Sequence, residues 1–518
     1  MSAAYQQVAS NESAFFAARE KFGALEGHMR SSVAMGMTHG EVESYVVEKT
    51  RDIARDLLQG HLHLRGAAER PVRVIGSDGV QRVQRRRSFR VLRSVVGNVE
   101  VPRLLYQAPG VAGLSPQDAS LSLAEDSFSM GVRRQVAEEA GRGSFDEVVE
   151  RVAATTGGHV AKRQVEQLAQ ASVVDFTEFY TSQTWEPDDA DSLLVLSFDG
   201  AGIIMRLESL RLETRRAADK KAEEPKAWPE RTGSGEKPNA KRMAEVATVY
   251  SVAPYVRDAD DIMGELRSLR VVRAADRPPR PRPRNKRVWA SVDKEIAEVI
   301  DEGFLEALRR DPDQQRHWVV LVDGDERQLR AIQAAARRHR VKLTIVCDFI
   351  HVMEYLWKAA YCFYEPATEE ARTWVCQHAR MLLEGVDPSH VAAGMRRSAT
   401  LRDLKSRKAV DTCARYIRKR RAYVRYGDAL ALGLPIASGA IEGACRHLVR
   451  DRLDRCGARW SVAGAEAVLK LRALTSSGDF DAYWDFHLGQ EHQRNHVSAY
   501  AQGRVPSPIT LPRLRRAK

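Results

Sequence analysis

The chain has 518 residues, with 81 Lys and Arg against 69 Asp and Glu and a formal net charge of +12. This length is too great for one ordinary domain, and no stretch approaches the roughly 20 consecutive apolar residues of a membrane-spanning helix. The six cysteines form no C-x-x-C pair and the first residues lack the pattern of a signal peptide, which argues against a secreted disulfide-rich module. We expect a cytoplasmic protein of several domains.

Basic residues are concentrated in a few stretches. This clustering favours a polyanionic partner such as nucleic acid, because each neutralised phosphate releases counterions. The alternative is that these basic stretches are ordinary solvent-exposed surfaces without a polyanionic partner. The stretches are Arg82 to Arg93, Arg277 to Arg287, Arg415 to Arg425 and Arg513 to Lys518.

The first regions are predicted to be helical and then β. Residues 1–66 carry apolar residues such as Val42, Val46 and Ile53 at helical spacing. Residues 67–110 alternate apolar and polar side chains, with Asp78-Gly79 and Gly97-Asn98 as turn signals. They predict a small basic antiparallel sheet, which either lies along DNA or is a plain exposed sheet.

Residues 111–176 are predicted to form a helix-turn-helix region. One helix covers Val132 to Ala140, and a second covers Phe145 to Thr155, with Ser144 and Glu147 as a capping box. A short glycine-containing break precedes a third helix, where a recognition helix would contact DNA. An ordinary pair of short helices is the alternative. The candidate DNA contacts at its start are Lys162, Arg163 and Gln164.

Residues 177–351 are predicted to form an α/β unit. The charged stretch from Arg215 to Lys241 is expected to be a loop, and residues 275–287, rich in Pro and Arg, are expected to be irregular. Helices are predicted from a Ser291 cap to Arg310 and from Arg327 to Arg338. The predicted strands are Leu193 to Phe198, an antiparallel return at Ile203 to Leu207, Ala244 to Val252, Trp318 to Val322, and Leu343 to Cys347. Three strands followed by helix-strand-helix-strand is the order of a ribonuclease-H-like mixed sheet.

The remaining regions are predicted to be mostly helical. Residues 352–436 form an all-α insertion whose aromatics indicate core packing. Residues 437–475 hold the final helices, the first capped by Ser438, and residues 476–518 form a C-terminal tail that is Pro-rich and basic from Gln502 on. Tyrosines alternate with basic residues over residues 411–426, which suits phosphate contacts with base stacking, although a solvated helix face fits as well. The candidate contacts there are Arg418, Lys419 and Arg421.

Two carboxylates are candidates for chemistry because each follows an apolar run and precedes a glycine. Asp199 and Asp323 would converge if their strands are neighbours, since ligands bind outside the carboxyl ends of strands in open sheets. Mg²⁺ prefers such hard oxygen ligands, and two ions can stabilise the attacking and leaving oxygens of a phosphodiester. The alternative is that each Asp-Gly is only a hairpin turn.

Glu442 is the third candidate acid. It lies one turn inside a predicted helix among small residues (Ser438 to Arg446, SGAIEGACR), which would let the helix press closely on a sheet. Each interior glycine costs a helix roughly 1 kcal/mol, a cost that is understandable if Glu442 must reach a metal site. The alternative is a surface pair with Arg446.

Two long stretches resemble the ISKra-type insertion-sequence transposases. They are Leu321 to Lys358 (LVDGDERQLRAIQAAARRHRVKLTIVCDFIHVMEYLWK) and Pro435 to Leu474 (PIASGAIEGACRHLVRDRLDRCGARWSVAGAEAVLKLRAL). Gly235 to Tyr250 and Ser477 to His487 are similar too, so that the resemblance covers about residues 85–500. It implies a bacterial DDE transposase with a ribonuclease-H-like core that an α-helical insertion interrupts before its last helix.

The resemblance also implies the site, the cofactor and the partners. Its acids correspond to Asp199, Asp323 and Glu442, which would hold two Mg²⁺ ions, with Mn²⁺ as a substitute. Ala201 stands where relatives often carry a lysine, so that no role of that lysine is transferred. The expected partners are terminal inverted repeats, target DNA and further copies of the chain in a dimer or larger assembly in the nucleoid. A catalytically inactive DNA-binding relative and a structure-specific nuclease are the alternatives.

Further residues are expected near the active site or on DNA. Cys347 and His351 resemble a Cys/His signature of the related Mutator-like transposases, but two residues cannot complete a zinc site. A purely structural histidine is the favoured interpretation of His351, with a position near the active site or DNA as the alternative ahead of a zinc ligand. Trp460 is either a wedge against a displaced base or part of the core. The other candidates are Gly200 and Gly324 beside the acids, and Arg446 and Arg450 on DNA.

Overall fold

The computed structural model describes residues 13–185, 188–223, 240–267, 279–402, 406–454 and 458–509. The chain forms two compact units. Unit 1 comprises Met1–Thr181 and Phe480–Lys518, and unit 2 comprises Ser182–Asp479. The predicted basic cluster at Arg513 to Lys518 and Cys456 lie outside the described residues. The other five cysteines are free thiols.

Unit 1 begins with the predicted helices, α2 (Phe16–Met29), α3 (Ser32–Met35) and α4 (His39–Ala68). A capping box between Thr38 and Glu41 starts α4, and Leu62 of α4 packs on Leu92 and Val99 of the small sheet. The helical prediction is therefore confirmed for the described part of residues 1–66.

The small antiparallel sheet of unit 1 is confirmed, with corrected turns. Its strands are β1 (Gln84–Ser94), β2 (Gly97–Ala108) and β3 (Val111–Leu114), in the order β1-β2-β3. Ser94 pairs with Gly97, so that the turn lies at residues 95 and 96 and the predicted turn at Gly97-Asn98 is wrong. Gly97 has φ +113° and starts the return strand. Before β1, isolated bridges join Ile75 to Gln81 and Gly76 to Tyr500 instead of a further strand pair.

The three helices predicted before residue 176 are present as α6 (Met130–Arg142), α7 (Phe145–Thr156) and α8 (Lys162–Ala171). The helices α5 (Pro116–Ser120) and α9 (Phe176–Ser182) were not predicted. The Ser144–Glu147 capping box is formed, and Gly157 ends α7 with φ +68°. Residues 480–495 of the region predicted as a tail form α22 (Phe480–Asn495), because His487 is buried and contacts Asp175 with Nδ1 at 2.6 Å. The short turns η3 (Val497–Ala499) and η4 (Ala501–Gly503) follow.

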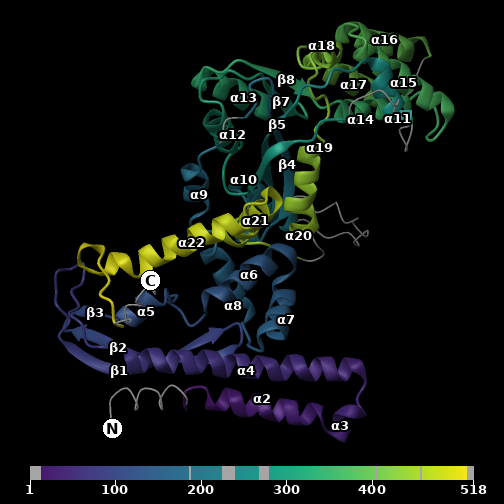
Figure 1. Ribbon diagram of the computed structural model, residues 1–518. Coiled ribbons are helices and arrows are strands. Elements are labelled where there is room, and N and C mark those ends of the chain that lie inside the picture. Colours follow the sequence, from purple (N-terminus) through teal and green to yellow (C-terminus); the bar gives the residue numbers. More distant parts are fainter. Residues whose placement is uncertain are drawn as a thin grey trace, which may run out of the picture. The chain divides into compact units, whose positions relative to one another are not determined.

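Unit 2 is built on a five-stranded mixed sheet, as expected for an α/β unit (Figure 1). The order is β6-β5-β4-β7-β8. Strands β4, β5 and β6 are antiparallel, whereas β7 and β8 run parallel to β4. The strands are β4 (Leu193–Ile204), β5 (Lys241–Val252), β6 (Arg284–Ser291), β7 (Trp318–Val322) and β8 (Leu343–Cys347).

Three local predictions in this unit are wrong. Strand β4 continues through Asp199-Gly200 to Ile204, because β5 pairs with its whole length, so that Ile203 to Leu207 is no separate return strand. The strand β6 starts at Arg284, within the stretch predicted to be irregular. Within the predicted loop from Arg215 to Lys241, α10 (Leu212–Glu223) extends to residue 223, and residues 224–239 lie outside the described residues.

Helices cover both faces of the sheet. On one face, α12 (Ile296–Arg310) packs so closely that a Cβ on Gly303 would meet Phe198 at 2.8 Å. Helix α13 (Glu326–His339) packs against α12 (Figure 1). Glu295, not Ser291, is the residue before α12, because Ser291 ends β6.

On the opposite face, the helical insertion shares a core with the sheet through Val195, Val319 and Leu321. The insertion consists of α14 (Phe349–Ala360), α15 (Glu369–Leu383), α16 (Pro388–Leu401), α17 (Lys408–Lys419) and α18 (Tyr426–Ala431), with α11 (Ala259–Arg267) beside α15. A helical run then follows: α19 (Gly439–Ala444), the π-helix η2 (Cys445–Arg450), α20 (Asp451–Leu453) and, after a break, α21 (Val462–Ser477). Within the described residues, no helix is both long and apolar enough to cross a membrane.

Candidate active site

Asp199 and Asp323 lie at the same level on adjacent parallel strands. Phe198 of β4 pairs with Val322, the last residue of β7, so Asp199 lies level with Asp323, which directly follows β7, and the charge of Asp323 acts on Asp199. Asp199 lies within β4 rather than at its end, five residues before Ile204. The two predicted acids are therefore brought together.

The electrostatics of Asp199 reflect burial and a neighbouring negative charge. Burial raises the pKa of Asp199, and the charge of Asp323 raises it further. Hydrogen bonds from the Cys445 thiol and the Gly200 backbone N–H, together with the charge of Arg450, act in the opposite direction. The donor distances are 3.2 Å from Cys445 Sγ and 2.7 Å from Gly200 N. A divalent cation would relieve the repulsion between the two carboxylates, so these residues fit such an ion.

The loop that carries Asp323 is fixed by the insertion. Tyr416 Oη of α17 donates to the backbone oxygen of Asp323 at 2.5 Å, and Arg420 Nε donates to the oxygen of Gly324 at 2.6 Å. Gly324 has φ +89°, and a Cβ there would lie 2.4 Å from Arg420 Nε. A side chain at residue 324 is therefore excluded by both conformation and space. The insertion holds the active-site loop in place.

Glu442 lies on α19, a helix that contacts both β4 and β5. Its side chain is exposed and makes no hydrogen bond or ion pair with a described residue, and the alternative pair with Arg446 is not formed, because Arg446 instead faces Asp451 at 3.6 Å. Three residues further along the same helical run, Cys445 contacts Asp199. Gly439 and Gly443 face open space, so the prediction that these glycines allow close packing on the sheet is wrong.

Among the described residues, no three His, Cys, Asp or Glu side chains are close enough together to hold a metal ion. Asp199 and Asp323 therefore form a pair, and Glu442 does not form a three-residue cluster with them. The helix of Glu442 nevertheless contacts β4, the strand that carries Asp199. This helix is anchored at its start by Asp348, which follows β8 as Asp323 follows β7. The buried carboxylate of Asp348 accepts from Ser438 N at 3.0 Å and from the Ser438 hydroxyl.

Glu245 is a buried acid near this site that the sequence prediction missed. It lies on β5 opposite Gly200 and accepts from Gln328 Nε2 of α13 at 2.6 Å. Burial, opposed by that hydrogen bond and assisted by the charges of Asp199 and Asp323, raises the pKa of Glu245 to about 8. The available signal was an acid inside the apolar run of a central strand, where an unpaired charge is costly.

The remaining predicted site residues have mainly structural contacts. His351 contacts the rings of Tyr355 and Tyr416, at 5.2 and 5.8 Å between centroids, and Tyr416 donates to the backbone of Asp323. Cys347 is buried, and burial raises its thiol pKa to about 12. Trp460 is buried and donates from Nε1 to Leu453 O at 3.1 Å. Trp460 is thus part of the core, and the wedge interpretation is wrong.

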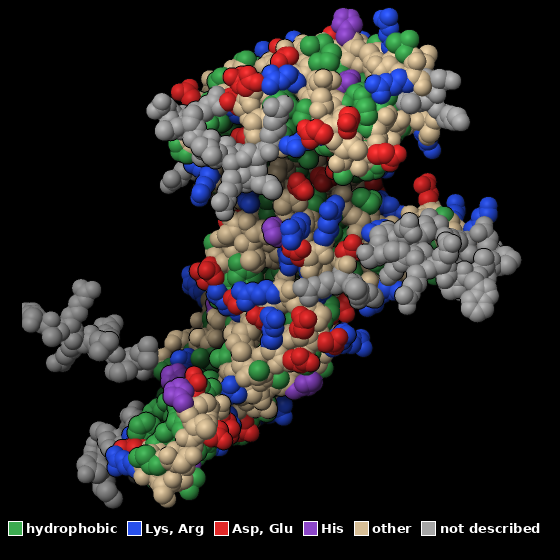
Figure 2. Space-filling view, turned by 90° about the vertical axis from the view of Figure 1, so that its right-hand side faces the viewer, with side chains coloured by type: hydrophobic (Ala, Val, Ile, Leu, Met, Phe, Trp, Pro, Cys, Tyr) green, Lys and Arg blue, Asp and Glu red, His purple; other side chains and the backbone are tan. Residues whose placement is uncertain are grey.

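The predicted DNA contacts are exposed to different degrees. At the start of α8, Lys162 pairs with Asp146 at 2.6 Å, Gln164 accepts from Ala161 N at 3.2 Å, and Arg163 is exposed. Figure 2 shows Lys and Arg interspersed with Asp and Glu on the visible face, without one continuous basic patch.

The tyrosines of residues 411–426 do not support base stacking. Tyr416 and Tyr426 are buried, and Tyr423 is half-buried. Lys419 pairs with Glu326 at 2.9 Å. The other predicted DNA contacts in unit 2 are exposed; they are Arg418, Arg421, Arg446 and Arg450.

No protein-family model matches the chain, and no curated protein shows significant similarity to it.

Proposed function

We propose that unit 2 is the catalytic core of an enzyme that cleaves and rejoins phosphodiesters with divalent metal ions. More narrowly, we propose a DDE transposase of the ISKra type with a ribonuclease-H-like core. The observation that carries this proposal is the placement of Asp199 and Asp323 at one level of adjacent parallel strands. The strand order supports it, since three antiparallel strands are followed by helix-strand-helix-strand.

Asp199 and Asp323 would hold Mg²⁺, and Glu442 of α19 would supply a third carboxylate ligand. Bound Mg²⁺ would supply Lewis-acid activation of a water or hydroxyl and charge stabilisation at the phosphate. The residues around the site hold the two aspartates in position. Cys445 and Gly200 orient the carboxylate of Asp199, whereas Tyr416 and Arg420 fix the loop of Asp323. Exposed Arg450, whose charge acts on Asp199, would attract the DNA phosphate.

In this proposal unit 1 binds the terminal inverted repeats of the element. Helices α7 and α8 are joined by the short segment of residues 157–161, which is the outline of a helix-turn-helix. Exposed Arg163 would contact DNA at the start of α8, and the basic strand β1 would add phosphate contacts. Because two element ends must be brought together, a dimer or larger assembly of the chain is expected on DNA.

The test uses a supercoiled donor plasmid carrying the DNA that flanks the gene, together with a target plasmid. In Mg²⁺ or Mn²⁺, a transposase produces nicks at defined element ends and joint molecules that contain target DNA. A structure-specific nuclease would cut without joining, and an inactive DNA-binding relative would bind without cutting. Joint molecules support the proposal, whereas binding or cutting alone overturns it.

A further inference from the structure

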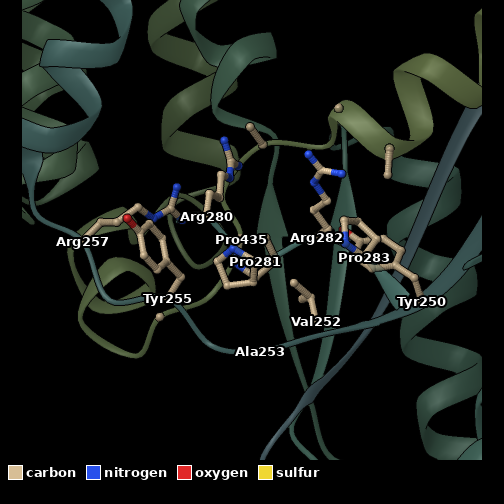
Figure 3. A pocket seen from close by; sticks show the side chains of 14 residues that line it. Tyr250, Val252, Ala253, Tyr255, Arg257, Arg280, Pro281, Arg282, Pro283 and Pro435 are labelled. Atoms are coloured by element: carbon tan, nitrogen blue, oxygen red, sulfur yellow. The ribbon is translucent and has the colours of Figure 1, made fainter. Parts of the chain in front are cut away.

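A cavity of about 430 Å³ lies in unit 2 beside the start of α19. Its walls come from the end of β5 and the segment that follows it, from the Arg-Pro-Arg-Pro segment before β6, and from the residues around Gly439 and Ala440. Its size lies within the ordinary range for ligand pockets. Figure 3 shows Arg257, Arg280 and Arg282 with their guanidinium groups on the same side of this pocket, and Tyr255 beside Arg257.

The wall with Tyr255 and Arg257 is built by specific hydrogen bonds. Tyr255 N donates to Gly433 O at 2.9 Å, and Arg257 N donates to Leu430 O at 3.2 Å. Arg257 Nη2 donates to Leu434 O at 2.9 Å. Gly433 has φ +70°, and a Cβ there would lie 2.7 Å from Tyr255 N. The pocket wall is therefore a fixed part of the fold rather than a loose surface loop.

The arginines of this pocket have no ion-pair partner among the described residues, although the more distant charges of Glu265 and Asp261 act on Arg257. Arg257 is only 7% exposed, its Nε has no hydrogen-bond partner, and it forms no ion pair with a described residue. Burial lowers the pKa of Arg257, and the nearby positive charge of Arg280 lowers it further. Arg280 and Arg282 are exposed and also form no ion pair among the described residues. A buried cation beside further cations is costly, and an anion in the pocket would compensate it.

The pocket also offers an aromatic surface next to these charges. The guanidinium of Arg257 lies 6.0 Å from the ring centroid of Tyr255, which is half-buried. Several arginines beside a tyrosine are the combination that binds single-stranded nucleic acid, with phosphates on the cations and a base on the ring. A small inorganic anion would use the arginines without the ring.

We propose that this pocket binds a nucleotide of a single DNA strand, with its phosphate on Arg257, Arg280 and Arg282 and its base against Tyr255. The proposal deepens and rests on the proposed function. From Ala440 in the pocket wall to Cys445 on Asp199 the helical run advances about 7 Å along its axis. The pocket and the two aspartates therefore lie along one helical run of unit 2, so that a strand bound in the pocket would be held near the candidate active site.

The experiment is photo-cross-linking of the full chain, in metal-free buffer, to single-stranded DNA that contains 5-iododeoxyuridine. The expected cross-link maps to the peptide with Tyr255. The double variant R280A/R282A should lower its yield by about fivefold or more, because it removes two of the three cations that hold the phosphate. The matched control R284A/K286A removes the same charge a few residues away, from positions that do not line the pocket, and should change the yield by less than about twofold.

Two further arms identify the ligand. Tyr255→Phe should retain the cross-link and Tyr255→Leu should lose it, while circular dichroism checks that both variants are folded. Unlabelled single-stranded DNA should compete with the cross-link far better than inorganic phosphate at the same phosphate concentration. Equal competition by inorganic phosphate, equal loss in the two double variants, or cross-links only elsewhere would overturn the proposal. Because no metal is present, these results are independent of whether the chain cleaves DNA.

Discussion

Cys445 Sγ lies 3.2 Å from Asp199 Oδ2, and this contact joins the helical run after the insertion to the central strand of the sheet. Cys445 begins a π-helical stretch, a local irregularity that is frequent at functional sites. Glu442 precedes it by three residues, so it lies near the same side of the helix. The chain thus brings a third acid toward the two aspartates although more than 100 residues separate Asp323 from Glu442.

Replacing Asp348 should loosen the helix of Glu442. Asp348→Ala leaves the buried Ser438 N–H and hydroxyl without an acceptor, which should cost about 2–4 kcal/mol in the free energy of unfolding. Hydrogen exchange of the amides of residues 438–445 should become faster, and urea denaturation gives the stability change.

The matched control is Asp387→Ala. Asp387 caps α16 by accepting from Ser389 N at 2.7 Å, but it is exposed and makes no contact with α19. The Asp387→Ala variant should lose about 1 kcal/mol in the free energy of unfolding, as expected for the loss of a helix cap. Hydrogen exchange of the amides of residues 438–445 should be unchanged. Equal exchange in the two variants would show that Asp348 does not anchor this helix.

A buried cluster around Glu306 should be a major contributor to the stability of unit 2. Glu306 is fully buried and accepts hydrogen bonds from Arg287, Arg309 and Arg310, which join α12 to β6. Glu306→Gln should destabilise the chain by about 3–5 kcal/mol, because it leaves buried cations uncompensated. Glu302→Gln, one turn earlier on α12 in a partly exposed pair with Lys294, should cost less than about 1 kcal/mol.

The same cluster predicts a loss of stability in acid. Burial alone would raise the pKa of Glu306, but its arginine partners outweigh burial and hold that pKa below 4.5. A carboxyl with a depressed pKa in the folded state stabilises the chain above its unfolded pKa, and this contribution is lost as the pH falls through the folded pKa. Denaturation curves of wild type and Glu306→Gln should therefore converge below pH 4.5; a constant difference would contradict this account.

For Glu245 we expect the opposite dependence of stability on pH. Its folded pKa of about 8 exceeds the ordinary 4.5, so ionisation in the unfolded chain costs stability as the pH rises between these values. Glu245→Gln can keep the bond from Gln328, and in metal-free buffer it should gain on the order of 3 kcal/mol at pH 7. Near pH 4 the gain should vanish. A gain that does not depend on pH would rule out a protonated Glu245 in the folded state.

The sequence predicted the parts of unit 2 that depend on apolar runs. Strands β7 and β8 have the predicted bounds because each run is short, mostly apolar and followed directly by an aspartate, although only the last two residues of β8 are buried. Strand β6 was missed because its first three residues are exposed and polar, and only Val288 to Ala290 in its buried second half are apolar. Asp199-Gly200 indicated a strand end, yet long-range pairing with β5 carries β4 further.

The candidate site could be predicted only in part. Asp199 and Asp323 followed from strand order, but the anchoring by Asp348 and the burial of Glu245 depend on contacts between distant segments. A sequence pattern pointed to each of these two acids. Asp348 follows the apolar run of β8 as Asp323 follows that of β7, and Glu245 interrupts an apolar strand. The pocket with Arg257 could not be foreseen, since it combines segments separated by more than 170 residues.

Strand cleavage by single-residue variants tests the central claim most directly. With element-end DNA and Mn²⁺, Asp199→Asn, Asp323→Asn and Glu442→Gln should each slow cleavage by at least about 1,000-fold, the equivalent of about 4 kcal/mol, while DNA binding persists. Asp451→Asn, an exposed acid in the same helical run as Glu442, should cleave like wild type. If Glu442→Gln cleaves as fast as Asp451→Asn, the three-carboxylate account is contradicted.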